Sequence, residues 1–387
     1  LSFLQNMEYG ETDRVRSGDW VLLSTCEDKY LFVEARANEK FRVSRERISA
    51  SELVGARFGT CFQVKGGRLV EEESTSIRFQ DEQNMDASNK DNRDLTDNNR
   101  AQRMSTTEIE NMKKSGASGE EIISALVAGS DTWDKKTEFS RAKYLKRKAK
   151  KYLPWIRVIK PTAATISRAF FHRATSGNKY IVLRPDALAA LLSLSNLRCG
   201  LDVLCVDGTG GVLLGGVLER LGNEKCCGRA FVPCLDTQRC TLPPIDAIRR
   251  FNWPKSRIDN TIVPCRFISN QSDSPIFELP PHASPRALIV ASKHNPISVL
   301  KMLLPFLLPS SAFAIYCDYL EPLALCLYQL QRRTDPTIPP TVNLVLSETW
   351  LRHFQILPNR THPDMNMSAT GGYLLSGTVL AASPLVT

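Results

Sequence analysis

The sequence predicts an α/β C-terminal domain that follows an N-terminal β-barrel-like domain and a helical segment rich in basic residues. Short aromatic and β-branched runs, broken by glycine and polar residues, fill residues 1–70. Three amphipathic helical patterns occupy residues 105–160, and strand-like apolar runs alternate with helical patterns over residues 161–387. Such alternation is typical of a mostly parallel sheet with helices on both faces.

Length and composition exclude several classes of protein. A chain of 387 residues can form two domains, and it contains no run of eighteen apolar residues that would span a membrane. Its eleven cysteines form no Cys-x-x-Cys pair and its five histidines are scattered. We therefore expect no zinc site, no disulfide framework and a reducing intracellular compartment. The chain opens at Leu1 without a secretory signal pattern, and we expect further residues to precede it.

The N-terminal β domain is predicted from three runs, Trp20–Leu23, Tyr30–Glu34 and Phe58–Val64. Their spacing suggests a small barrel or sandwich. Residues 71–104 then change in composition, with Asp, Glu, Asn and Ser in place of large apolar residues. Such a stretch cannot bury enough apolar surface to offset its loss of conformational entropy, so we expect a disordered linker there.

Three helices are predicted between residues 105 and 160. Ser105 and Glu108 have the spacing of a capping box, and Ser118 and Glu121 repeat it. The first helix should end near Gly116 and the second at Gly129, because glycine is common just past the end of a helix. The third should begin near Thr137 and end before Pro154.

The third helix carries most of the excess charge of the chain. Residues 135–151 contain nine Lys or Arg and one acid, a net charge of +8, against +9 for the whole chain. An apolar stripe at three- and four-residue steps would pack inward, made of Phe139, Ala142, Leu145, Ala149 and Tyr152. The cations off this stripe are candidate RNA contacts: Lys143, Lys146, Arg147, Lys148, Lys150 and Lys151. The alternative is a solvated face, which the concentration of like charges disfavours.

From residue 161 the chain reads as a Rossmann-type fold. Strands are predicted at 201–206, 229–232, 287–291, 313–316 and 342–346, with helices at 185–192 and 212–221. A turn containing Gly208, Gly210 and Gly211 joins the first of these strands to its helix. A strand, a glycine-rich turn and a helix form the first unit of nucleotide-type binding folds.

The residues around this turn depart from a working methyltransferase pocket. Val206 stands where an acid should end the strand, with Asp207 one place late, and Val212 stands at the third glycine position. The next strand lacks its ribose-binding acid because Asp236 comes late, and Ala291-Ser-Lys-His-Asn-Pro296 replaces a catalytic carboxylate. We therefore predict a methyltransferase-like fold with a degenerate pocket that binds no cofactor and has no catalytic residue. Gly208, Gly210 and Gly211 would then form a structural turn.

A third informative stretch lies near the C-terminus. Leu357-Pro-Asn-Arg-Thr-His-Pro363 leads to the glycine-rich run Met367–Gly377, which predicts a defined loop that enters a final strand. Two interpretations remain open here. The loop is either a structural hairpin near the sheet edge or a contact with RNA or another subunit through Arg360 and His362.

Four blocks of sequence together resemble one known family. They are Gly18-Asp-Trp-Val-Leu-Leu23, the segment 97–152, Phe251-Asn-Trp-Pro-Lys-Ser256, and the Leu357–Pro363 loop with Gly371-Gly-Tyr-Leu-Leu-Ser-Gly377. Over nearly the whole chain they resemble the non-catalytic subunit of the eukaryotic tRNA (adenine-N1)-methyltransferase. The basic-helix block is the most specific of the four.

The resemblance implies a role as a tRNA-binding subunit. It implies a paralogous catalytic partner that binds S-adenosylmethionine, a heterotetramer with two of each subunit, and a nuclear location. The complex would make 1-methyladenosine at position 58 of the tRNA T-loop. Two alternatives remain: a catalytically active RNA methyltransferase that acts alone, and an RNA-binding translation factor without a methyltransferase partner. Binding of S-adenosylmethionine by the isolated chain would favour the first, and purification without a second subunit the second.

Overall fold

The computed structural model describes residues 13–27, 29–71, 102–133, 136–174, 179–222, 228–234, 245–269, 275–355, 361–365, 367 and 369–381. The chain divides into two compact units, Leu1–Lys160 and Pro161–Thr387. The predicted linker at 71–104 lies almost entirely outside the described residues. Among the helices that are described, none has the length and apolar content needed to cross a membrane.

The first unit contains an antiparallel sheet, as the sequence predicts. Its strands run in the order β2-β1-β7-β5-β6, and β3 and β4 form a separate hairpin. The core of this unit is apolar and includes the fully buried side chains of Leu23, Ile48 and Ile156. The strands are β1 (Trp20–Thr25), β2 (Tyr30–Glu34), β3 (Lys40–Val43), β4 (Glu46–Ser49), β5 (Cys61–Lys65), β6 (Arg68–Glu71) and β7 (Trp155–Ile159), with a short helix η1 (Ala50–Leu53).

The position of β7 differs from the prediction. The sequence predicts a helical segment over residues 105–160, but β7 lies between β1 and β5 in the sheet. Its local pattern is that of a strand, because Ile156 and Val158 are buried while Arg157 between them is exposed. The helical segment is therefore an insertion between two neighbouring strands of one sheet.

The three predicted helices are confirmed. They are α1 (Thr106–Lys114), α2 (Gly119–Ala128) and α3 (Glu138–Tyr152). Both capping boxes are formed: the backbone N–H of Glu108 donates to Ser105 Oγ at 3.2 Å, and that of Glu121 donates to Ser118 Oγ at 3.2 Å. Thr137 caps α3 by accepting from the N–H of Ser140. Helices α2 and α3 pack against each other.

The second unit contains a seven-stranded sheet in the order β10-β9-β8-β13-β14-β18-β15. The first five strands are parallel, and β18 runs antiparallel to both β14 and β15. This confirms the predicted mostly parallel sheet, although the first strand begins at Val203 rather than Leu201. The strands are β8 (Val203–Asp207), β9 (Ala230–Pro233), β10 (Ile262–Cys265), β13 (Ala287–Ala291), β14 (Ala312–Cys317), β15 (Thr341–Trp350) and β18 (Thr370–Val379). Two small hairpins, β11–β12 (Phe267–Ser269, Pro275–Phe277) and β16–β17 (Phe354–Gln355, His362–Pro363), lie outside this sheet.

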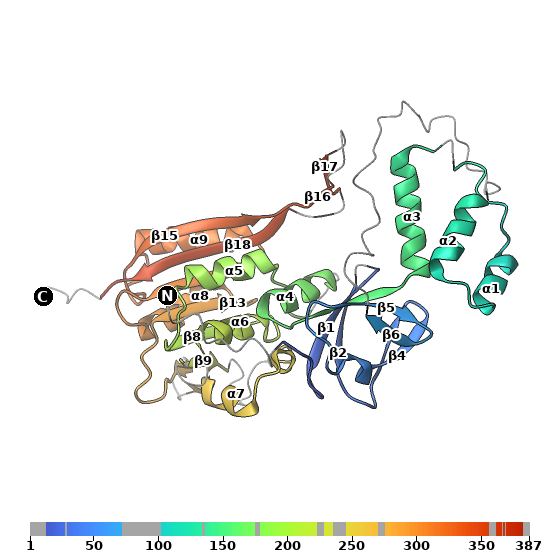
Figure 1. Cartoon of the computed structure of the whole chain (residues 1–387). Coiled ribbons are helices and arrows are strands. Elements are labelled where there is room, and N and C mark those ends of the chain that lie inside the picture. The colour runs from blue at the N-terminus through green and yellow to red at the C-terminus, as the bar shows by residue number, and fades with distance from the viewer. Residues whose placement is uncertain are drawn as a thin grey trace, which may run out of the picture. The chain divides into compact units, whose positions relative to one another are not determined.

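Helices cover both faces of the seven-stranded sheet (Figure 1). Helices α4 (Ala163–His172), α5 (Pro185–Leu194) and α6 (Val212–Arg220) contact one another on one face. Helices α8 (Pro296–Leu303) and α9 (Leu320–Arg332) cover the other, together with the short helix η3 (Leu304–Phe306), and their apolar side chains form one core with the strands. Val206 belongs to that core. The elements α7 (Lys255–Thr261) and η2 (Ile248–Phe251) lie between β9 and β10 along the chain.

Candidate functional site

The glycine turn joins β8 to α6 at the carboxyl edge of the parallel sheet. Gly210 and Gly211 have φ angles of +73° and +95°, a backbone region that side chains disfavour. Gly211 is the N-cap of α6, and Val212 is the first helical residue and is buried. The turn therefore needs glycine for its backbone shape, whether or not it binds a ligand.

Asp207 uses its carboxylate to hold this turn together. Its Oδ1 accepts from the backbone N–H and the hydroxyl of Thr209 at 2.6 and 2.7 Å, and its Oδ2 accepts from the N–H of Leu214 at 2.8 Å. Burial raises the pKa of Asp207, while these hydrogen bonds oppose the rise. Thr209 Oγ1 in turn accepts from the N–H of Leu213 at 2.8 Å. Both carboxylate oxygens of Asp207 therefore accept hydrogen bonds from the chain itself. Two backbone N–H groups in the first turn of α6, which lack partners within the helix, also find acceptors here.

Neighbouring segments of the chain also cover the glycines. A Cβ atom at Gly210 would lie 3.0 Å from the ring of Tyr180, and one at Gly211 would lie 3.0 Å from the backbone of Ile245. The carbonyl oxygens of Gly208 and Gly210 accept from the N–H groups of Ile181 and Ala247. The glycines of the turn are therefore packed against Tyr180 and Ile245 of the same chain.

The ends of β9 and β13 offer no described acid, whereas Asp318 follows β14. Beyond β9, Asp236 lies outside the described residues. Beyond β13, Asn295 caps α8 by accepting from the N–H of Ile297 at 3.1 Å, and Lys293 and His294 are exposed. Ser292 Oγ is buried and has no hydrogen-bond partner among the described residues. The described residues that follow β13 therefore supply no carboxylate at the place of a catalytic acid. The exposed Asp318 follows β14 instead, and its Oδ1 accepts from the Tyr316 hydroxyl at 2.9 Å.

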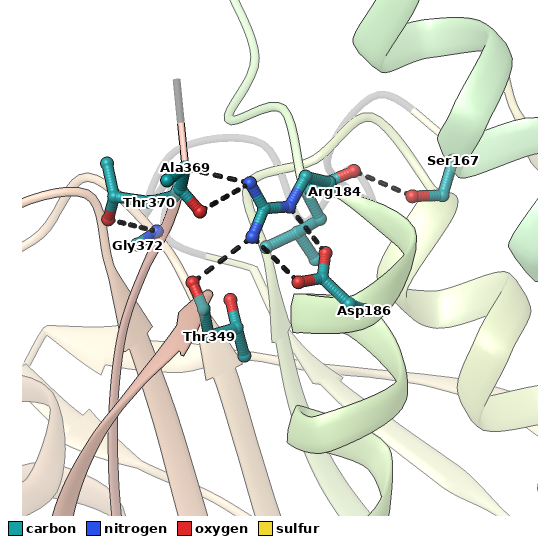
Figure 2. A network of polar contacts seen from close by, with 8 residues as sticks. Ser167, Arg184, Asp186, Thr349, Ala369, Thr370 and Gly372 are labelled. Carbon is teal, nitrogen blue, oxygen red and sulfur yellow. Dashed lines mark hydrogen bonds and ion pairs between the residues drawn. The ribbon is translucent and has the colours of Figure 1, made fainter. Parts of the chain in front are cut away.

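Arg184 links α5 to the antiparallel strands at the same edge of the sheet, and Figure 2 shows its contacts. Its Nε and Nη2 atoms donate to the two carboxylate oxygens of Asp186 at 2.6 and 2.7 Å. Its remaining donors reach the carbonyl oxygens of Thr349, Ala369 and Thr370 at 2.9 to 3.1 Å. Only 3% of the Arg184 side chain is exposed. The Arg184 guanidinium is therefore a buried structural clamp on the C-terminal strands, while its partner Asp186 is partly exposed.

This clamp explains part of the Gly371-Gly-Tyr motif. A Cβ atom at Gly371 would lie 2.7 Å from Arg184 Nη2, and one at Gly372 would collide with the hydroxyl of Tyr316. Gly372 also has a φ angle of +88°. Close packing at the start of β18 requires both glycines.

The basic helix α3 presents four exposed cations, Lys143, Lys146, Arg147 and Lys151. None of the four forms an ion pair with a residue in the described part of the chain. Ala149 of the predicted apolar stripe is buried, and Leu145 and Tyr152 are half-buried. The side chains of Phe139 and Ala142 lie outside the described ones. These four cations have the exposure that contact with a polyanion requires.

Lys148 and Lys150 are less accessible than the sequence suggested, since both are half-buried. Burial lowers the pKa of Lys148, and the charges of Lys151 and Arg147 lower it further. The main cause that lowers the pKa of Glu27 is its hydrogen bond with Lys29, and the nearby charge of Lys150 adds to it. Lys150 therefore lies close enough to Glu27, in the β1–β2 turn, for its charge to act on that carboxylate.

The predicted contacts near the C-terminus are only partly described. Arg360 lies outside the described residues. His362 is exposed, and it pairs with Gln355 across the antiparallel β16–β17 ladder. This pairing is that of a hairpin, so the described residues agree with the structural interpretation of the loop. A contact between His362 and RNA stays a prediction.

A cavity near the glycine turn was not anticipated from the sequence. It has a volume of about 220 Å³ and is lined by Phe170, Arg173, Lys179, Tyr180, Val182 and Arg250. Basic and aromatic residues interleave in Phe170-Phe-His-Arg173 and in Lys179-Tyr180, which is the pattern that could have indicated it. The three segments are separated in sequence, and only the fold brings them together.

The family profile and the curated relatives that match this chain describe the same kind of protein. A profile of the Gcd10p family matches residues 14–303. The tRNA (adenine(58)-N(1))-methyltransferase non-catalytic subunit of Mus musculus is 27% identical, over 96% of this chain and 89% of the relative. The subunit of the same name from Dictyostelium discoideum is 26% identical, over 94% of this chain and 79% of the relative.

The fold has counterparts among solved structures. A SAM-dependent O-methyltransferase from Thermotoga maritima aligns with a TM-score of 0.53 and 13% identity, covering 96% of this chain and 97% of that one. Similarity at this level of identity shows the fold and carries no information on activity.

Proposed function

The chain belongs to the Gcd10p family, and from that premise we propose that it is the non-catalytic, tRNA-binding subunit of the tRNA (adenine-58-N1)-methyltransferase. In this function it pairs with a catalytic subunit that binds S-adenosylmethionine. The complex transfers a methyl group to N1 of the adenine and produces 1-methyladenosine in the T-loop.

The occupied glycine turn is the observation that carries the non-catalytic role. A cofactor-binding turn of this fold needs open backbone above its glycines and an acid that is free to anchor a ribose. Here Tyr180 and Ile245 lie against the glycines, and both oxygens of Asp207 accept hydrogen bonds from the turn and from α6. The residues present therefore do not fit S-adenosylmethionine, and no chemical step is assigned to this chain.

The exposed cations of α3 support the tRNA-binding role. Four cations of α3 are exposed, namely Lys143, Lys146, Arg147 and Lys151. The helix itself packs against α2 in the same unit. Phosphate contacts of this kind supply affinity and orient the RNA without reading its sequence. The catalytic partner must then act on an adenine that has left its stack, a step that depends on how firmly the surrounding RNA is held.

The assembly and location of the complex complete the proposal. Two copies of this chain and two catalytic subunits form a heterotetramer, and the complex works in the nucleus. Both statements follow from the family resemblance. Fluorescence microscopy of the tagged full-length protein tests the location, and native mass spectrometry of the purified complex tests the stoichiometry.

Reconstitution tests the proposed function directly. The chain and its catalytic partner are purified separately and together, incubated with tRNA and S-adenosylmethionine, and digested for quantification of 1-methyladenosine by mass spectrometry. We expect product only when both subunits are present. Product formed by this chain alone would instead support a stand-alone methyltransferase. A chain that binds RNA yet never associates with the catalytic subunit would support an RNA-binding factor of another kind.

A further inference from the structure

We propose that the cavity lined by Phe170, Arg173, Lys179, Tyr180, Val182 and Arg250 binds one unpaired nucleotide of the tRNA. This inference rests on the proposed function and adds a second RNA contact, in the unit that does not contain the basic helix. We refer to this site as the nucleotide cavity.

The charges around the nucleotide cavity favour an anion. Three of its six lining residues are cations, and none of the six is an acid. Burial lowers the pKa of Arg250, and the charge of Arg173 lowers it further, while Asp246 opposes both. Like charges that are held together around a concave surface create a local positive potential, which a phosphate group would relieve.

Two aromatic rings hold these cations along the wall of the cavity. The guanidinium carbon of Arg250 lies 5.1 Å from the ring centroid of Phe170, and Nζ of Lys179 lies 5.5 Å from that of Tyr180. Both distances are in the range of cation–π attraction. The Tyr180 ring also packs against Gly210, where an added Cβ atom would lie 3.0 Å from it. The cavity thus offers rings for stacking and cations for phosphate in one place.

The cavity is small enough that only part of a larger ligand can enter it. Its volume of about 220 Å³ is below the roughly 300–1,000 Å³ typical of sites that enclose a small molecule. A single base or phosphate can enter while the rest of the ligand stays outside. An unstacked nucleotide within an RNA chain has this shape, and proteins commonly bind such nucleotides by stacking on aromatic rings and arginine planes.

The test uses the complex of this chain with its catalytic partner and measures tRNA affinity between 50 and 200 mM KCl. Arg173→Gln removes a cation from the cavity, and Tyr180→Leu removes a ring while it keeps an apolar cover on Gly210. Tyr180→Phe retains the ring. Arg168→Gln is the matched control, because Arg168 lies on α4, which ends just before Arg173, is exposed and does not line the cavity.

We expect the two disruptive variants to act differently. Arg173→Gln should reduce the slope of log affinity against log salt by roughly 0.7, the value for one phosphate contact in a single strand. Tyr180→Leu should weaken binding between about fivefold and a hundredfold with an unchanged slope, as expected for loss of one stacking interaction. Tyr180→Phe and Arg168→Gln should bind like the wild type. If Tyr180→Leu lowers the melting temperature of the complex, Lys179→Gln at the exposed end of the cavity replaces it.

Two results would overturn the inference. One is unchanged affinity and slope in Arg173→Gln and in Lys179→Gln, while neutralisation of the α3 cations abolishes tRNA binding. The nucleotide cavity would then have no RNA contact, but the proposed function would stand. The other is binding of free adenosine monophosphate that Arg173→Gln weakens, with tRNA affinity unchanged, which would assign the cavity to a free nucleotide. A wild-type complex that does not bind tRNA at all would instead contradict the proposed function.

Discussion

Arg184 shows how a single residue determines the arrangement of the carboxyl edge. Its planar guanidinium satisfies a carboxylate and three backbone carbonyls at once, which the single ammonium of lysine cannot do in this geometry. Burial would raise the pKa of Asp186, but the hydrogen bonds and charge of Arg184 outweigh burial and lower it. The ion pair therefore stabilises the folded state as long as the Asp186 carboxyl is ionised.

Replacement of Arg184 by methionine should destabilise the second unit strongly. It leaves Asp186 without its partner and three carbonyl oxygens without their donors, and loss of one member of a buried pair typically costs about 3–5 kcal/mol. Urea unfolding, followed by the fluorescence of the intact chain, measures the loss. Arg198→Met at an exposed position is the control and should change the free energy of unfolding by less than about 0.5 kcal/mol.

Asp186→Asn should give a pH-dependent loss of stability. At pH 7 we expect the variant to be less stable by about 1–3 kcal/mol, because the hydrogen bonds of Arg184 lose their charged acceptor. The folded-state pKa of Asp186 is lowered, so its contribution is present above the unfolded pKa of about 3.9 and is lost as the pH falls through the folded value. Unfolding midpoints of wild type and variant should converge below pH 4. A gap that stays constant from pH 7 to pH 3 would contradict the ionic role.

At the scale of elements, the α2–α3 pair presents the basic surface. The start of α2 packs so closely on the end of α3 that a Cβ atom at Gly119 would collide with the carbonyl oxygen of Tyr152. The apolar residues Ile122, Ile123 and Leu126 of α2 are buried. The orientation of the cations on α3 therefore depends on close packing between two helices and not on α3 alone.

Neutralisation of the four exposed cations of α3 should weaken tRNA binding and reduce its salt dependence. We expect the variant with glutamine at Lys143, Lys146, Arg147 and Lys151 to lose about 3–4 units of slope in log affinity against log salt, and most of the methylation by the complex. The matched control replaces Lys40, Arg42, Arg45 and Arg47, which are four exposed cations of the β3–β4 hairpin in the same unit. Equal effects in both variants would mean that net charge, and not α3, determines binding.

Gly119→Ala should affect binding through packing. The added methyl group forces α2 away from α3, and we expect about 1–3 kcal/mol of destabilisation, the usual range for overpacking. Hydrogen exchange in α3 should increase, and tRNA affinity should fall although every cation is retained. Glu120→Ala places the same methyl group at the next, exposed position and should leave both unchanged. Unaltered exchange in α3 of Gly119→Ala would contradict the packing role.

At the scale of the whole molecule, the two units combine a basic surface with a methyltransferase fold whose turn is occupied by its own chain. The chain belongs to the Gcd10p family and shares the fold of a SAM-dependent O-methyltransferase. A fold of this kind can persist without catalysis when it completes an assembly, since bound partners stabilise the native state.

The isolated chain should not bind S-adenosylmethionine. The reason is that Asp207, Thr209 and Tyr180 occupy the turn from within. Isothermal titration of the purified chain should give no saturable heat, while titration of the reconstituted complex should show binding in its catalytic subunits. A dissociation constant in the micromolar range for the chain alone would contradict this expectation. It would support the alternative that the chain is a methyltransferase that acts alone.

The sequence alone determined the features that depend on local order. Capping boxes at Ser105 and Ser118 fixed two helix starts, and alternation of strands and helices predicted the parallel sheet. Val212 at the third glycine position is the first residue of α6 and is buried, as its residue type suggested. The prediction that Val206 ends the strand is wrong, because β8 ends at Asp207, whose carboxylate is used by the turn itself. Each of these signals lies within a few residues, where backbone geometry is set by near neighbours.

Only the tertiary structure decided the features that depend on distant residues. Strand β7 pairs with β1 and β5 across more than ninety residues of sequence, so it could not be separated from the helical segment by spacing. Burial of Lys148 and Lys150 depends on which elements pack against α3. The periodicity of the helix cannot predict those neighbours. The nucleotide cavity joins α4, the segment before α5 and η2, and the clamp at Arg184 joins α5 to β15 and β18. Contacts of this kind follow from how the layers pack, and a local sequence pattern cannot predict them.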